Sequence, residues 1–180
     1  MTHVASLQWL RRQRNADGSW GYLPGRPGSG EPTLLALAAG AEGSLEWLGA
    51  HLDGWPRLLA PAALSQTAGA DAIAAASIEY LLGWHGASEP VPRDIVDQDA
   101  TIDGWPWTGD TSSWVEPTAY AVLSLAAGGH ADHPRVREGE ALLLDRRCVD
   151  GAWNHGNPRV LGKDLESFLP ATGWTCLALR

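Results

Sequence analysis

A short motif, in which an Asp-Gly turn is followed by tryptophan, recurs four times along the 180-residue chain. The fullest copy, residues 13–21, ends in Asp17-Gly18-Ser19-Trp20-Gly21. Shorter copies begin at Asp53, Asp103 and Asp150, so successive copies start 36, 50 and 47 residues apart. Periods of roughly 20–50 residues are typical of repeat proteins built from one supersecondary unit. The motif therefore predicts one domain, residues 1–180, made of similar stacked units.

Each turn separates two kinds of helix-like segment. Before the first turn, Val4, Leu7 and Leu10 have the spacing of an amphipathic helix, and the opposite face is rich in arginine. After it, residues 33–39 are apolar on every side, which is typical of a buried helix. The sequence predicts three more buried helices of this kind, at 72–82, 118–126 and 174–179.

The complete unit is thus an outer amphipathic helix, an Asp-Gly-x-Trp turn, a loop and a buried inner helix. We expect about four units, with boundaries near 1–42, 43–83, 84–130 and 131–180. Residues 56–66 are expected to add a short helix, and 83–102 to form an irregular connection rich in acids and proline.

Two of the inner segments begin with the same tripeptide, Glu31-Pro32-Thr33 and Glu116-Pro117-Thr118. Proline in a first turn costs no hydrogen bond, and a carboxylate there suits the helix dipole. Glu31 and Glu116 hold equivalent places, so we expect them at the same mouth of the fold. Two interpretations are open. The acids offset helix dipoles only, or they form a ligand-binding site together with Trp107, Trp114 and Tyr120.

Composition excludes several classes of partner. The net charge is −8 and the chain has a single lysine, so a nucleic-acid partner is not expected. The apolar runs are shorter than the ~20 residues of a membrane span, and no signal peptide is visible, so we expect a cytoplasmic protein without a transmembrane segment. The two cysteines, Cys148 and Cys176, are expected to be buried thiols.

The first copy of the motif, with Gln13, Gly18-Ser19-Trp20 and the lead-in Trp9-Leu10, resembles the QW repeat of squalene–hopene cyclases and related triterpene cyclases. The resemblance spans nearly the whole chain, but only this copy keeps the glutamine. It implies an all-α fold, the α/α-toroid that protein prenyltransferase β subunits share. Four outer/inner hairpins make an incomplete toroid, so we expect self-association or a partner chain to complete it.

The catalytic motifs of these families are altered in this chain. The Asp-x-Asp-Asp acid of the cyclases is nearest to Asp97-Gln98-Asp99-Ala100, which makes Asp97 and Asp99 the candidate catalytic residues implied by the resemblance. Acids in such a proline-flanked loop are also typical of a solvent-exposed turn. The zinc-binding Asp-Gly-Cys of the prenyltransferases falls on Asp150-Gly151-Ala152, and its histidine falls near Ala171, so we expect no metal and no other cofactor.

Two functions remain. The first is a terpenoid cyclase- or prenyltransferase-like protein that binds or processes an isoprenoid or other apolar ligand; if catalytic, it would be an isomerase or transferase of that type. The second is a non-catalytic repeat scaffold that binds a protein partner on its concave face. A dry, tryptophan-lined pocket with an inward acid favours the first, and a shallow polar groove favours the second.

Overall fold

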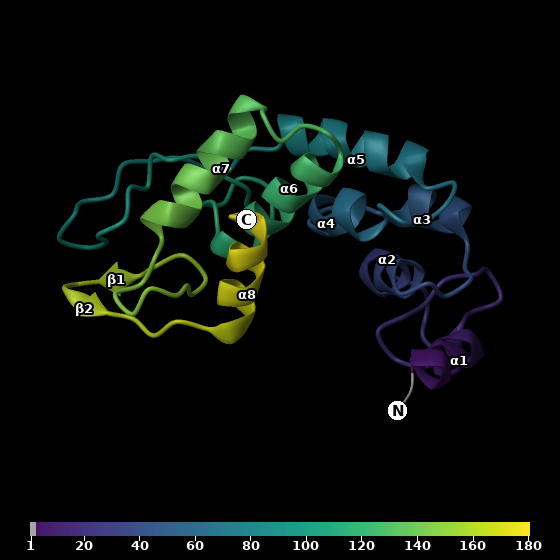
Figure 1. Cartoon of the computed structure of the whole chain (residues 1–180). Helices are drawn as coiled ribbons and strands as arrows, with labels where there is room; N and C mark the ends of the chain where they lie inside the picture. The colour runs from purple at the N-terminus through teal and green to yellow at the C-terminus, as the bar shows by residue number, and fades with distance from the viewer. Residues whose placement is uncertain (1–2) are drawn as a thin grey trace.

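The computed structural model describes residues 3–180, in which the chain forms eight α-helices and one short β-hairpin (Figure 1). The mainly helical fold agrees with the sequence-based prediction, which did not include the hairpin. None of these helices is long and apolar enough to cross a membrane. The elements are α1 (His3–Gln13), α2 (Gly30–Ala38), α3 (Leu45–His51), α4 (Pro56–Ala63), α5 (Asp71–Gly83), α6 (Val115–Ala127), α7 (Pro134–Asp145), β1 (Arg159–Val160), β2 (Lys163–Asp164) and α8 (Leu169–Ala178).

Four helices form a curved row, with α2 and α8 at its two ends (Figure 1). In this row α4 packs between α2 and α6, and α6 packs against α8. Three of the other helices cover the row, because α3 packs on α2, α5 on α4 and α7 on α6. Helix α6 lies deepest, since ten of its thirteen residues are buried.

The prediction of a buried helix over residues 72–82 is wrong. In α5 only Ser77, Ile78 and Leu81 are buried, and the place between α2 and α6 belongs to α4. The reason is the alanine content of α5: a methyl side chain costs little when exposed, so an alanine-rich face gives no signal of its orientation. The short α4 was expected only as an addition, yet it supplies the buried residues Leu58, Leu59 and Ala60.

All-round burial is also wrong for the first and last helices of the row. Leu35 of α2 is 46% exposed. In α8 only Ala171 and Thr175 are buried, whereas Leu177 is 40% exposed. Cys148 is buried as expected. Cys176 is exposed, because it lies beside Leu177 on the part of α8 that no other helix covers.

Three of the four Asp-Gly turns with a following tryptophan share one pattern of hydrogen bonds. Each tryptophan is buried, with at most 7% of its surface exposed. Its indole N–H donates to a carbonyl of the preceding helix at 2.6–2.9 Å, and its backbone N–H donates to a threonine hydroxyl in the following helix at 3.0–3.1 Å. The sets are Trp20 with Leu10 and Thr33, Trp105 with Leu81 and Thr118, and Trp153 with Leu143 and Thr172.

We call this arrangement the tryptophan clamp. The threonine is the fourth residue of its helix in all three cases, in α2, α6 and α8. The turn at Asp53-Gly54-Trp55 departs from the pattern, because Trp55 directly precedes α4 and leaves no loop between turn and helix. Trp55 is only half-buried.

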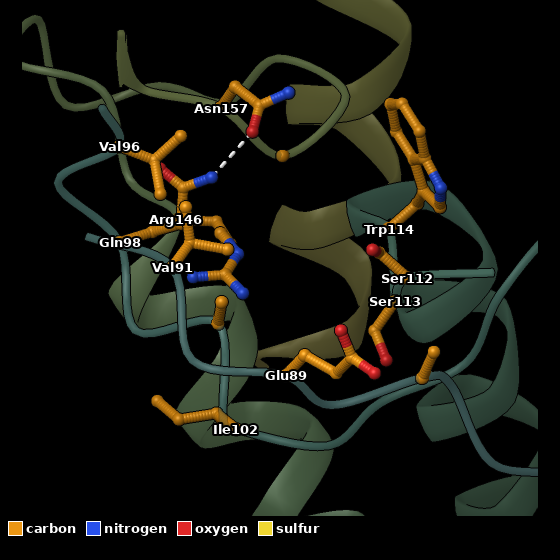
Figure 2. A pocket seen from close by; sticks show the side chains of 13 residues that line it. Glu89, Val91, Val96, Gln98, Ile102, Ser112, Ser113, Trp114, Arg146 and Asn157 are labelled. Atoms are coloured by element: carbon orange, nitrogen blue, oxygen red, sulfur yellow. Dashed lines mark hydrogen bonds between the residues drawn. The ribbon is translucent and has the colours of Figure 1, made fainter. Parts of the chain in front are cut away.

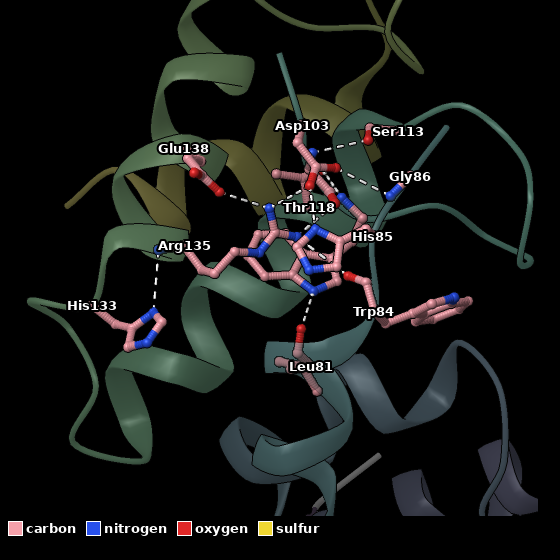
Figure 3. Close-up of polar contacts among 12 residues, drawn as sticks. Leu81, Trp84, His85, Gly86, Asp103, Ser113, Thr118, His133, Arg135 and Glu138 are labelled. Carbon is pink, nitrogen blue, oxygen red and sulfur yellow. Dashed lines mark hydrogen bonds and ion pairs between the residues drawn. The ribbon is translucent and has the colours of Figure 1, made fainter. Parts of the chain in front are cut away.

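A buried arginine strengthens the clamp of the third turn (Figure 3). The guanidinium carbon of Arg135 in α7 lies 4.2 Å from the centre of the Trp105 ring. Arg135 donates to the Asp103 carboxylate at 2.8 Å and to the Gly104 carbonyl at 2.9 Å. It also donates to Glu138 at 2.8 Å, so the buried charge has two carboxylate partners. Arg135 was not singled out from the sequence.

Replacing a clamp tryptophan should destabilise the whole chain. Trp20→Ala removes a buried ring together with its indole hydrogen bond to Leu10, and we expect a loss of about 3 kcal/mol or more in the free energy of unfolding. Urea denaturation measures this loss. The control is Trp9→Ala, since Trp9 is 49% exposed and its removal should cost far less. Equal free energies of unfolding for Trp20→Ala and the parent protein would contradict a structural role for the clamp.

Candidate functional site

Four aromatic side chains from different parts of the chain meet around Tyr120 of α6. The Tyr120 ring centre lies 6.1 Å from that of Trp55, 6.0 Å from that of Trp107 and 4.9 Å from that of Trp174. Trp107 and Trp174 meet Tyr120 edge to face, at 76° and 88°, which is a favourable arrangement for aromatic rings. Tyr120 is 9% exposed and the three tryptophans are half-buried. We call these four residues the aromatic face.

Each member of the aromatic face is supplied by a different segment. Trp55 stands at the start of α4, Trp107 follows the third turn, and Tyr120 and Trp174 belong to α6 and α8. The sequence prediction included Trp107 and Tyr120 in one site, and the structure places them in contact. It missed Trp55 and Trp174 as site residues. No local signal could have found them, because their partners lie far away along the chain.

Glu116 lies one helical turn before Tyr120 and is 94% buried, since its exposed fraction is 6%. Both of its carboxylate oxygens face Nδ1 of His155, at 2.9 and 3.0 Å. A carboxylate accepts hydrogen bonds, so the proton of a neutral His155 is assigned to Nδ1, and Nε2 remains as an acceptor. The Phe168 ring lies 4.8 Å from the imidazole. His155 reads in the sequence as an ordinary loop histidine; the structure pairs it with Glu116, which the sequence did not predict.

Glu31, the other predicted carboxylate, accepts a hydrogen bond from the hydroxyl of Tyr22. Its charge also reaches the aromatic face. The pKa of Tyr120 is raised to about 12, first by burial and then by the negative charges of Glu116 and Glu31. Both predicted acids thus add to the raised pKa of Tyr120, while their meeting at one mouth of the fold stays a prediction.

Trp114 is the residue before α6 and has a different role from Trp107. It lies between two cavities and lines both of them. The larger, about 390 Å³, is also bordered by His155, Leu165 and Phe168. In residues 3–180 no ring contact joins Trp114 to the aromatic face.

The second cavity, about 310 Å³, is partly polar (Figure 2). Gln98 and Arg146 stand on one side of it, and Ser113 and Trp114 on the other. The Gln98 side-chain amide donates to the Asn157 side chain, and Arg146 donates to the Asp99 carbonyl at 3.0 Å. These polar groups do not form the dry, tryptophan-lined pocket expected of a cyclase.

The candidate acids Asp97 and Asp99 lie beside this polar cavity in an irregular loop. Asp97 is exposed. The Asp99 carboxylate accepts hydrogen bonds from the hydroxyl of Thr101 at 2.6 Å and from its backbone N–H at 2.9 Å, and these bonds lower the pKa of Asp99. A catalytic proton donor needs a raised pKa, so this environment does not favour Asp99 as the acid of a cyclisation.

The residues that align with the zinc ligands of the prenyltransferases, Asp150-Gly151-Ala152, form the fourth Asp-Gly turn. Asp150 accepts hydrogen bonds from the Ser167 hydroxyl at 2.7 Å and from the backbone N–H of Ala152 at 3.1 Å. Within the described part of the chain, no group of three or more His, Cys, Asp or Glu residues is arranged to hold a metal ion.

A scan against models of known protein families finds no match for the chain, and a search of curated proteins finds none either. The likeness to triterpene cyclases therefore rests on the residues of the repeat themselves.

The raised pKa of Tyr120 gives a test of the site's electrostatics. In an unfolded chain a tyrosine ionises near pH 10, whereas folded Tyr120 should ionise near pH 12. The stability contributed by neutral Tyr120 is complete below pH 10 and is lost as the pH rises through about 12. Phenolate absorbance should show a late transition that Tyr120→Phe removes, and the variant's stability should fall less steeply over this range. If the late transition is still present in Tyr120→Phe, the assignment to Tyr120 is contradicted.

Proposed function

We propose that this chain is an incomplete α/α-toroid that binds an isoprenoid or another apolar chain on its aromatic face. The observation that carries the proposal is the convergence of Trp55, Trp107 and Trp174 on Tyr120. Half-buried aromatic rings offer a large apolar contact area at low entropic cost. The helices α2, α4, α6 and α8 form one row, and along the chain each of them is next to a covering helix. This alternation supports the toroid assignment.

The proposed role is binding rather than acid-initiated cyclisation. A carbocation reaction needs a strong acid and a site closed to water. Here Asp99 has a lowered pKa, Ala100 replaces the last acid of the motif, and the three tryptophans are partly exposed. The chain thus keeps an apolar recognition surface, while its surroundings do not favour the family's chemistry.

Farnesol is a suitable first ligand, because it has an isoprenoid chain and no charge. We expect it to bind the wild-type chain in equilibrium dialysis, and Trp107→Leu to weaken binding about tenfold through loss of one aromatic contact. Trp9→Leu is the matched control, since Trp9 lies on α1, outside the aromatic face. The proposal fails if farnesol does not bind, or if both variants bind it as well as the parent.

A protein-binding scaffold is the second candidate, supported by the exposed apolar residues at α8. Leu169 is 89% exposed, Phe168 43% and Leu177 40%, and they lie close together along the chain. Burial of such a surface by a second copy or by a partner chain is favourable, at about 25 cal/mol per Å².

Sedimentation velocity at micromolar concentration tests this candidate. Self-association through α8 should produce a dimer or larger species, and Leu177→Glu should shift it toward monomer. Leu144→Glu is the control, because Leu144 is also exposed, at 59%, but belongs to α7. A monomer at all concentrations would remove self-association and leave only a separate partner chain.

A further inference from the structure

The charges around the aromatic face specify the head group of its ligand. We propose, on the basis of the proposed function above, that the aromatic face takes a cationic amphiphile, an apolar chain that ends in an ammonium group. The same charges disfavour an anionic head group such as a diphosphate. The proposal rests on the aromatic rings, on two carboxylates from different helices, and on the contacts that the neighbouring basic side chains already make.

The rings supply the first part of the argument. The face of an aromatic ring carries negative charge density and attracts an ammonium group within about 6 Å of the ring centre. Tyr120 has three tryptophans around it, and two of them meet it edge to face. Tryptophan gives the strongest interaction of this kind, and quaternary ammonium ligands are recognised in proteins by such clusters.

The second part is the pair of carboxylates. Glu116 stands one turn from Tyr120 on α6, and the negative charge of Glu31, in the first turn of α2, also raises the pKa of Tyr120. Helix N-termini carry a partial positive charge of about half an elementary charge each, which would favour an anion. Each of these acids lies in the first turn of its helix and more than offsets that charge. The carboxylate of Glu116, one turn from Tyr120, therefore favours a cation beside the aromatic face, and the charge of Glu31 acts in the same direction.

The third part is that nearby basic side chains already contact other residues. His155, when protonated, is paired with Glu116. Arg57 follows Trp55 by two positions, but its guanidinium lies 5.4 Å from the Tyr80 ring, between α4 and α5, with Asp53 at 3.9 Å. Arg135 is held by Asp103 and Glu138 on the side of Trp105. His155 and Arg135 thus already face carboxylates, and Arg57 lies against the Tyr80 ring of α5.

The test compares three ligands with one farnesyl chain and different head groups: farnesol, farnesyl trimethylammonium and farnesyl diphosphate. Equilibrium dialysis below the aggregation concentration of each ligand measures the dissociation constants. We expect the ammonium ligand to bind at least about tenfold tighter than farnesol, and the diphosphate to bind weaker than farnesol.

Glu31→Gln identifies the origin of the preference. It removes one charge from a half-buried residue and should reduce the preference for the ammonium ligand over farnesol several-fold. Glu46→Gln is the matched control, because Glu46 is an exposed acid in the first turn of α3. Glu116→Gln should act more strongly, but its buried place makes Glu31→Gln the decisive variant, with circular dichroism as the check of folding.

The outcomes separate the two proposals. If farnesol and the ammonium ligand both fail to bind, the proposed function is overturned. If farnesol binds but the ammonium ligand binds no tighter, the proposed function stands and the inference about the head group is overturned. The inference is also overturned if Glu31→Gln and Glu46→Gln reduce the preference equally, because the effect then comes from net charge alone.

Discussion

The tryptophan clamp is the interaction on which the rest of this structure depends. One residue makes two hydrogen bonds in opposite directions, from its indole to the preceding helix and from its backbone to the following one. The same pair recurs at Trp105 and Trp153, and all three rings are buried. A buried polar group left without a partner is costly, so the clamp fixes the distance and direction between the two helices that it joins.

The one turn without a clamp has the clearest link to the proposed function. Trp55 directly precedes α4, and its ring is free to lie against Trp107 and Tyr120. Clamps on both sides hold the neighbouring helices in place: Trp105 fixes the start of α6, and Trp153 fixes the start of α8. A surface of half-buried aromatic rings is thus presented by a rigid frame, which is favourable for binding because little order is lost when a ligand arrives.

The environment of the candidate acids separates binding from catalysis. The carboxylate of Asp99 completes its own turn with Thr101, and the cavity beside it is lined by polar groups such as Gln98 and Arg146. Glu116, in contrast, is buried beside the aromatic face and is held by His155. The negative charge that raises the pKa of Tyr120 therefore comes from two carboxylates in the first turns of their helices, Glu116 and Glu31.

The sequence by itself determined the repeat, the mainly helical fold and the grouping of Trp107 with Tyr120. These features follow from local spacing, from turn chemistry and from side chains large enough to require burial. Tertiary structure alone decided that α4 rather than α5 lies in the central row, because alanine-rich faces are nearly neutral to exposure. It also decided that Trp55, Trp174 and His155 belong to the site, since the contacts that bring them there join residues far apart in the chain, and no local pattern records which distant segments will pack together.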